Sequence, residues 1–133
     1  MVQRRFENGK NVMGRWDQVF CVLSAEPRRQ LIVSLLDCPV DQSVPLPESA
    51  INPNVPAHPG RLKNDLQHNH LPKLADFGFI EWETEPLVAY RGPRFEEVAV
   101  VFEALHLSST DIPDSLVKGC QRLEQERQVA FED

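Results

Sequence analysis

Hydrophobic residues recur at helical spacing in two segments near the start of the chain. The pattern predicts a helix over residues 15–23 and another over residues 25–37, because apolar side chains three and four positions apart share one helix face. Ser24 is expected to act as the N-cap of the second helix, and Pro27 fits its first turn. The residues expected to face the core are Trp16, Val19, Phe20, Leu23, Leu31, Ile32, Leu35 and Leu36, and those expected to face outward are Arg28, Arg29 and Gln30.

A proline-rich stretch interrupts this helical pattern. Six of the chain's 11 prolines lie between residues 39 and 59, and each fixes φ and disfavours helix at the residue before it. One short turn is expected there, over residues 47–52, within an otherwise extended loop. Helical spacing resumes over residues 61–77, where Pro72 predicts a bend or break near residues 68–71. Gly78 is expected to end this helix in a left-handed conformation.

The period changes to that of β-strands after this glycine. Residues 79–83 and 87–91 have the composition of strands and flank a turn at residues 84–86, which predicts a β-hairpin. Helical spacing returns afterwards and predicts two further helices, over residues 94–106 and 112–131. The expected fold class is therefore α+β, mostly α.

These elements divide the chain into three expected parts. Residues 1–14 contain two glycines and little apolar periodicity, so they are expected to form a flexible basic arm. Residues 15–93 form the expected domain, and residues 94–133 form a C-terminal helical dimerisation segment. Its apolar stripes, over 95–105 and 116–123, are expected to pair with a second copy in a homodimer. The alternative is that they pack on their own domain within a monomer.

The helix that leads into the hairpin carries a resemblance to a known family. The predicted elements follow the order of a winged helix-turn-helix domain: two helices, a connector, a third helix and a hairpin. Residues 70–80, HLPKLADFGFI, resemble the end of the recognition helix of ArsR-type winged-helix repressors, and residues 23–36, LSAEPRRQLIVSLL, are similar to the helix that opens such domains. The paired arginines of residues 23–36, together with HLPKLA in residues 70–80, resemble a haloarchaeal group of these proteins. The resemblance covers residues 16–92.

The resemblance implies a DNA-binding transcriptional regulator that has double-stranded DNA as its partner and needs no cofactor. The helix before the hairpin is the one that such domains lay in the major groove, where Arg and Lys reach guanine or phosphate and Asn and Gln pair with adenine. The residues expected to contact DNA are Arg61, Lys63, Asn64, Gln67, His68, Asn69 and Lys73. One alternative is an ordinary solvated helix face. Another is a winged-helix module that has lost DNA binding and recruits a protein partner.

The distribution of charge modifies this interpretation. Residues 1–95 carry 11 Lys or Arg and 11 Asp or Glu, whereas residues 96–133 carry 3 and 9, so the acidic end supplies the net charge of −6 and is expected to face away from DNA. An excess of acidic side chains would also suit a protein in a high-salt cytoplasm. Glu83 and Glu85 make the hairpin tip acidic, and phosphate repulsion predicts that the tip stays out of the minor groove. The proline-rich stretch replaces the helix that normally braces the recognition helix, which departs from the family pattern.

No catalytic or metal site is expected, so the protein is not expected to be an enzyme. Cys21, Cys38 and Cys120 lack the spacing of a zinc ribbon and are expected to be buried thiols. His68 and His70 would point to nearly opposite sides of a helix, which prevents chelation of one metal, and His70 is expected to pack inward. Nothing resembles a secretory leader or a bilayer-spanning run, so a soluble, cytoplasmic protein is expected.

Overall fold

Two helices, α1 (Val2–Leu23) and α2 (Glu26–Asp37), open the chain in the computed structural model, which describes residues 2–132 and the side chains of residues 5–130. Both predicted helices are confirmed, but the predicted N-cap is wrong: Ala25 occupies the N-cap of α2, and the Ser24 hydroxyl instead donates to the Cys21 carbonyl at 2.6 Å. The expected flexible arm is wrong over its described part, since residues 2–14 are helical. Gly9 and Gly14 each cost a helix about 1 kcal/mol relative to alanine, but they do not forbid it.

The face of α1 that enters the core differs from the expected one. Val19, Val22 and Leu23 are buried, whereas Trp16 and Phe20 are exposed and stack on each other with 5.7 Å between ring centroids. The core-facing side therefore lies about a sixth of a turn from the predicted stripe. It was misplaced because the apolar residues of α1 cover more than one face of the helix.

The proline-rich stretch adds a strand that the sequence did not predict. β1 (Val44–Pro45) pairs antiparallel with β3 (Leu87–Arg91), with Val44 opposite Ala89. Because β1 lies at the edge of the sheet, its proline can be accommodated. The short 3-10 turn η1 (Glu48–Ala50) follows and confirms the turn predicted over residues 47–52.

One continuous helix runs over residues 59–76 and is called here the α3–α4 helix. It consists of α3 (Pro59–Asp65), a π-helical turn η2 (Leu66–His70) and α4 (Leu71–Asp76). In the wider turn the Leu71 N–H donates to the Leu66 carbonyl, and Pro72, which has no N–H, follows as an early residue of α4. The predicted disturbance near residues 68–71 is therefore a local change of winding, and the helix continues through it.

Gly78 ends the α3–α4 helix and starts the hairpin, as predicted. Its φ is 81°, and its N–H donates to the Ala75 carbonyl at 2.9 Å while the Phe79 N–H donates to the Leu74 carbonyl at 3.0 Å. This pair of hydrogen bonds is the Schellman arrangement that satisfies helix carbonyls through a left-handed residue. The predicted hairpin is confirmed: β2 (Ile80–Thr84) pairs with β3 in a three-stranded antiparallel sheet of order β1-β3-β2.

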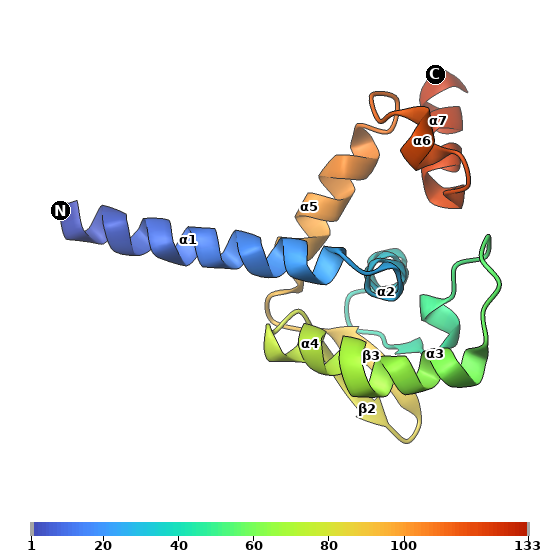
Figure 1. Cartoon of the computed structure of the whole chain (residues 1–133), viewed down its shortest axis with the longest axis horizontal. Helices are drawn as coiled ribbons and strands as arrows, with labels where there is room; N and C mark the ends of the chain where they lie inside the picture. Colours follow the sequence, from blue (N-terminus) through green and yellow to red (C-terminus); the bar gives the residue numbers. More distant parts are fainter. Residues whose placement is uncertain (1, 133) are drawn as a thin grey trace.

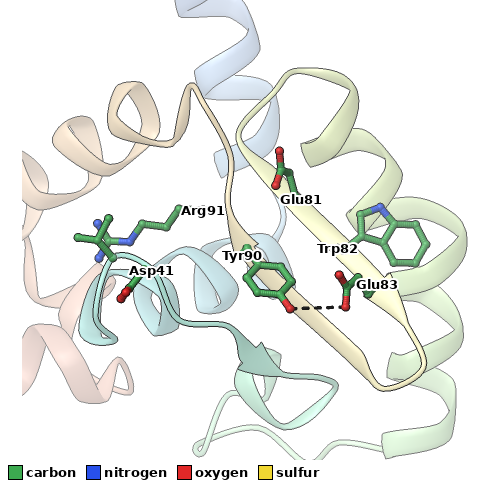
Figure 2. A pocket seen from close by; sticks show the side chains of 7 residues that line it. Asp41, Glu81, Trp82, Glu83, Tyr90 and Arg91 are labelled. Atoms are coloured by element: carbon green, nitrogen blue, oxygen red, sulfur yellow. Dashed lines mark hydrogen bonds between the residues drawn. The ribbon is translucent and has the colours of Figure 1, made fainter.

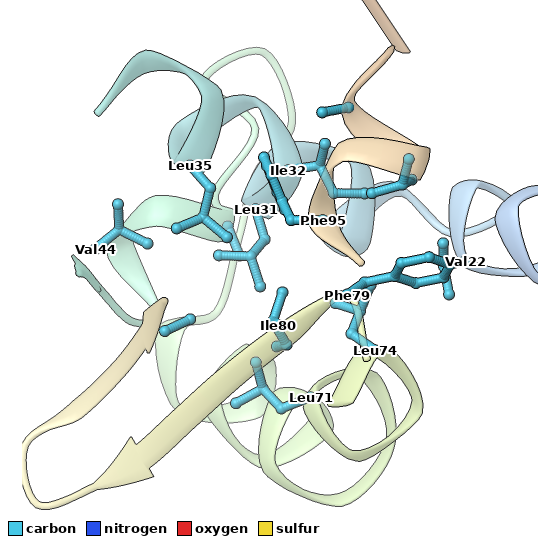
Figure 3. Close-up of a cluster of buried hydrophobic side chains, with 14 of the residues drawn as sticks. Val22, Leu31, Ile32, Leu35, Val44, Leu71, Leu74, Phe79, Ile80 and Phe95 are labelled. Carbon is cyan, nitrogen blue, oxygen red and sulfur yellow. The ribbon is translucent and has the colours of Figure 1, made fainter. Parts of the chain in front are cut away.

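A single hydrophobic core joins α2, the α3–α4 helix and the sheet (Figure 3). Leu31, Ile32 and Leu35 of α2 are fully buried and lie at its centre. The other labelled core residues are Val22, Val44, Leu71, Leu74, Phe79, Ile80 and Phe95. Because the inner faces of the α3–α4 helix and of the hairpin both pack here, the core fixes these two elements relative to each other.

The C-terminal part begins with α5 (Phe95–Leu107), which confirms the helix predicted over residues 94–106. The single helix predicted over residues 112–131 is wrong: it is divided into α6 (Asp114–Val117) and α7 (Gln121–Glu132). The division lies at Gly119, whose φ of 96° is incompatible with a continuous right-handed helix.

The apolar stripes expected to pair with a second copy are largely occupied within the protein. Phe95, Val98 and Phe102 are buried in its own core, and Leu123 is buried as well, whereas Leu105 and Leu116 are exposed. The expectation that these stripes form a dimer interface is therefore wrong for most of their residues. No helix within residues 2–132 has the length and apolar character needed to cross a membrane.

Candidate nucleic-acid interface

The α3–α4 helix presents one polar face to solvent. Its opposite face carries Leu66, His70, Leu71 and Leu74, all buried against α2 and the hairpin. Exposed positions expected to contact DNA are Arg61, Lys63, Asn64, His68 and Asn69. Because residues three, four and seven positions apart share a helix face, Arg61, Asn64 and His68 form a row along the exposed side.

The first turn of this helix is ordered by His58. Its side chain serves as the N-cap: Nδ1 accepts from the Arg61 N–H at 3.2 Å. Arg61 and Lys63 therefore lie within the first turn and a half, where the unpaired helix N–H groups also give a partial positive charge. This end of the helix is suited to contact a phosphate group.

Two of the expected DNA-contacting residues lie apart from the exposed row. Gln67 is half-buried on the flank of the helix. Lys73 is also half-buried, and its Nζ lies 3.8 Å from the Cys21 Sγ at the end of α1. The exposed row also contains an acidic member that the sequence analysis did not weigh, Asp65. Five of the seven expected residues are thus exposed, three of them in one row, and one carboxylate lies beside that row.

His70 anchors the helix from its buried side, as predicted. Its Nδ1 lies 2.8 Å from the Arg28 Nη1, and since a guanidinium can only donate, this ring nitrogen accepts. Burial, together with the adjacent Arg28 charge, lowers the pKa of His70. The imidazole is therefore neutral with its proton on Nε2.

Arg28 was expected to face outward and is instead buried, with 5% of its surface exposed. Its guanidinium donates to the carbonyls of Val22 at 2.9 Å and Cys21 at 3.0 Å, in addition to His70. These carbonyls belong to the last turn of α1, where they lack helical partners. The prediction that Arg28 faces outward was wrong because the amphipathic pattern of α2 contains no information about the unpaired carbonyls at the end of α1.

Other arginines have the same capping role, which sequence reasoning missed. Arg29 donates to the Leu23 carbonyl at 2.7 Å, Arg91 to the Leu35 carbonyl at 2.8 Å, and Arg94 to the Phe77 carbonyl at 2.8 Å. Each of these carbonyls lies at the C-terminal end of a helix, where a cation is favourable. The guanidinium groups that hold the domain together are therefore directed inward, and they do not add to the exposed row of the α3–α4 helix.

The outer face of the hairpin is acidic. Glu81, Glu83 and Glu85 are exposed, and the Tyr90 hydroxyl donates to the Glu83 carboxylate at 3.5 Å (Figure 2). An open depression of about 490 Å³ covers this face, lined by Val40, Asp41, Glu81, Trp82, Glu83, Tyr90 and Arg91. Negative charge at these positions would repel phosphate, and the expectation that the hairpin tip stays out of the minor groove remains a prediction.

The cysteines are free and half-buried, where full burial was expected. Within the part of the chain that the structure describes, no three His, Cys, Asp or Glu side chains come together as ligands for a metal ion. Comparison with known proteins finds no matching family model, no matching curated protein and no matching solved structure. The candidate interface is therefore defined by the geometry and chemistry of this chain alone.

Proposed function

We propose that this protein is a DNA-binding transcriptional regulator of the winged-helix type, with the α3–α4 helix as the element that enters the major groove. One observation carries the proposal: the helix is held by a largely apolar inner face, while its outer face exposes Arg61, Asn64, His68 and Asn69. A rigidly supported helix with hydrogen-bonding side chains along one exposed side is the element that reads base edges in this groove.

The order of the elements supports the same proposal. The α3–α4 helix leads through Gly78 into a two-stranded hairpin, and β1 completes a three-stranded sheet behind it. The passage from this helix through a glycine into a hairpin is the order of elements on which the resemblance to ArsR-type winged-helix repressors rests. The carboxylates of α6 and α7 lie at the far end of the molecule from the hairpin (Figure 1), so they are kept away from a duplex bound to the helix.

The roles of the exposed residues follow from their chemistry. Arg61 and Lys63, at the first turns, contact phosphates and supply salt-dependent affinity. Asn64 and Asn69 have amide groups that can pair with adenine, and His68 can donate to or accept from a base edge. Asp65 lies on the same exposed side as Arg61, and its carboxylate opposes phosphate there.

The test is fluorescence anisotropy of the whole chain with labelled genomic fragments over a salt series. Arg61→Ala and Lys63→Ala are each expected to weaken binding to every sequence and to reduce the slope of log K against log salt by about one. Lys118→Ala, at an exposed lysine between α6 and α7, is the matched control and should leave binding unchanged. Wild-type protein that shows no salt-sensitive binding to any fragment would contradict the proposal.

The acidic hairpin face favours a second candidate function, a winged-helix module that binds a protein partner instead of DNA. Glu81 and Glu83 line the open depression beside Tyr90, and a basic surface on a partner would complement them. The two functions predict different results in the same assay. If the wild-type protein shows no salt-sensitive DNA binding, and charge reversal of Glu83 and Glu85 does not increase its affinity for DNA, the interaction module is favoured.

A further inference from the structure

The projecting part of α1 carries an apolar face that nothing in the described chain covers. Every side chain from residue 5 to residue 13 is exposed, and α1 extends away from the body of the molecule (Figure 1). The exposed fractions are 68% for Phe6, 61% for Met13, 48% for Trp16 and 58% for Phe20. These four residues, called here the α1 stripe, are separated by seven, three and four positions, so they lie on one face of the helix.

The α1 stripe is large for a surface that faces water. Three aromatic side chains and one methionine, each about half to two-thirds exposed, leave roughly 300–500 Å² of apolar surface in contact with solvent. Patches of this size on a monomer mark interaction sites. The stripe lies on a different side of α1 from the buried Val19 and Val22, so a partner can cover it without displacing core residues.

The helix itself also requires such a partner. Gly9 and Gly14 lower its intrinsic helicity, and residues 5–13 make no buried contact with the rest of the protein. A helical segment of this length is marginal in water unless an apolar face is packed. Packing of the α1 stripe against another surface would supply the stabilisation that the described chain does not provide.

We propose that the α1 stripe binds α1 of a second copy in an antiparallel pair about a two-fold axis near Met13. The charges beside the stripe select this partner and this orientation. Lys10 and Asp17 lie on the same flank, are both exposed and take part in no ion pair within the described residues. Because the axis lies midway between them, Lys10 of each copy faces Asp17 of the other.

A parallel pair is disfavoured by the same residues. In a parallel coiled coil a flanking residue faces the opposite flank of the partner five positions later, which would place Arg5 beside Lys10 of the second copy. The antiparallel pair replaces this repulsion with two equivalent ion pairs and joins identical stripes. The surface is thus complementary to itself, as a two-fold interface requires.

The first experiment measures the dimer dissociation constant of the whole chain by sedimentation equilibrium over a concentration series. Met13→Glu places two carboxylates at the two-fold axis and is expected to raise this constant by about 100-fold. Leu107→Glu, at an apolar residue 86% exposed at the end of α5, is the matched control and should leave it unchanged. The cooperative unfolding transition of each variant verifies that the domain is folded.

A second experiment tests the orientation by exchanging charges. Lys10→Asp alone and Asp17→Lys alone are each expected to raise the dissociation constant by roughly tenfold, and the double exchange is expected to restore it. A wild-type protein that is monomeric throughout the series would overturn the proposal. A dimer that is insensitive to Met13→Glu, or a double exchange that fails to recover, would overturn it as well.

This inference does not depend on DNA binding, and neither experiment contains DNA. A dimer that forms through α1 without binding any duplex would therefore support the interface and contradict only the proposed function. If both hold, the two-fold axis places two α3–α4 helices symmetrically, and the preferred DNA site is expected to be an inverted repeat.

Discussion

At the scale of the residue, Arg28 joins three elements through one guanidinium group. It is buried between the end of α1, the start of α2 and the π-helical turn, and its donors are divided among the Val22 and Cys21 carbonyls and His70. A buried charge is tolerated only where hydrogen bonds replace its hydration. The charge therefore fixes how the α3–α4 helix is seated on the rest of the domain.

The first prediction is that Arg28→Met lowers the free energy of unfolding by about 2–4 kcal/mol. The methionine preserves the apolar part of the side chain but leaves two helix-end carbonyls and the His70 Nδ1 without a donor inside the protein. Urea unfolding followed by circular dichroism measures the change. Arg61→Met, at an exposed position, should stay within about 0.5 kcal/mol of wild type. Equal losses in the two variants would refute the structural role of Arg28.

The second prediction concerns pH and His70. Its pKa in the folded protein is lowered by burial and by Arg28, so folding favours the neutral ring. The stabilisation is complete above the ordinary histidine pKa of about 6.5 and is lost as the pH falls below it, with a slope of at most about 1.4 kcal/mol per pH unit. His70→Gln should flatten this loss, as seen in unfolding curves across the acidic range.

Two other histidines must be considered when this experiment is interpreted. The pKa of His106 is also lowered, first by burial, so part of the acid loss is expected to persist in the His70 variant. His68→Gln, at an exposed position on the same helix, is the matched control. A profile unchanged by His70→Gln would show that the ring is not held neutral by its surroundings.

At the scale of the element, the base of the hairpin depends on a close backbone approach. A Cβ added to Gly92 would lie 2.5 Å from the Gly78 carbonyl oxygen and 2.7 Å from the Ile80 nitrogen. The Gly92 N–H also donates to the Phe79 carbonyl at 2.9 Å. Glycine is thus required where the end of β3 crosses the junction between the α3–α4 helix and β2.

The third prediction is that Gly92→Ala destabilises the protein by about 1–3 kcal/mol or more, because the added methyl group forces backbone to move. Gly14→Ala gives the opposite sign. Its Cβ would meet nothing within 4 Å, so α1 should gain helicity and about 0.5–1 kcal/mol. Thermal unfolding of both variants measures the contrast. A neutral Gly92→Ala would show that the hairpin base tolerates a wider separation.

Local signals along the chain account for the elements that were predicted correctly. Gly78 predicted the left-handed end of the helix, and the alternation of apolar and polar residues after it predicted the strands. Both features depend on only a few neighbouring residues. The inward packing of His70 followed from its place on the helix. The β1 strand and the inward turn of Arg28 depend on partners more than 40 residues away in sequence, such as Ala89 for Val44 and His70 for Arg28. No short-range pattern contains that information.

The candidate site divides in the same way. Arg61 and Asn64 were placed on the exposed face by helical spacing alone. Lys73 was misjudged because the π-helical turn changes the winding before it, and it lies beside Cys21 of α1. The exposed stripe on α1 was missed because Gly9 and Gly14 suggested a flexible segment, although Phe6 and Met13 continue the helical spacing of Trp16 and Phe20.

At the scale of the whole molecule, charge is distributed by distance from the α3–α4 helix. The net charge of −6 comes from residues 96–133: α5 carries three glutamates with no Lys or Arg, whereas α6 and α7, at the opposite end of the molecule from the hairpin (Figure 1), carry four carboxylates and two arginines. The hairpin carries Glu81, Glu83 and Glu85, and its β2 strand packs against α4 of the proposed DNA-binding helix. Because the field of a charge is screened over about 8–10 Å at physiological salt, the hairpin acids oppose binding far more than the C-terminal ones.

The last prediction separates these two groups of acids. Glu83→Lys with Glu85→Lys should raise affinity for a random-sequence duplex about tenfold or more at low salt, because it reverses charge at the hairpin tip beside the duplex. Glu103→Lys with Asp111→Lys changes the net charge by the same amount at exposed positions in the C-terminal part, and it should have a smaller effect. Fluorescence anisotropy over a salt series measures both. A larger gain and a steeper salt dependence for the hairpin pair would place the hairpin next to DNA. Equal gains would mean that net charge alone governs the contact, and the α3–α4 helix would then lose its assignment as the docking element.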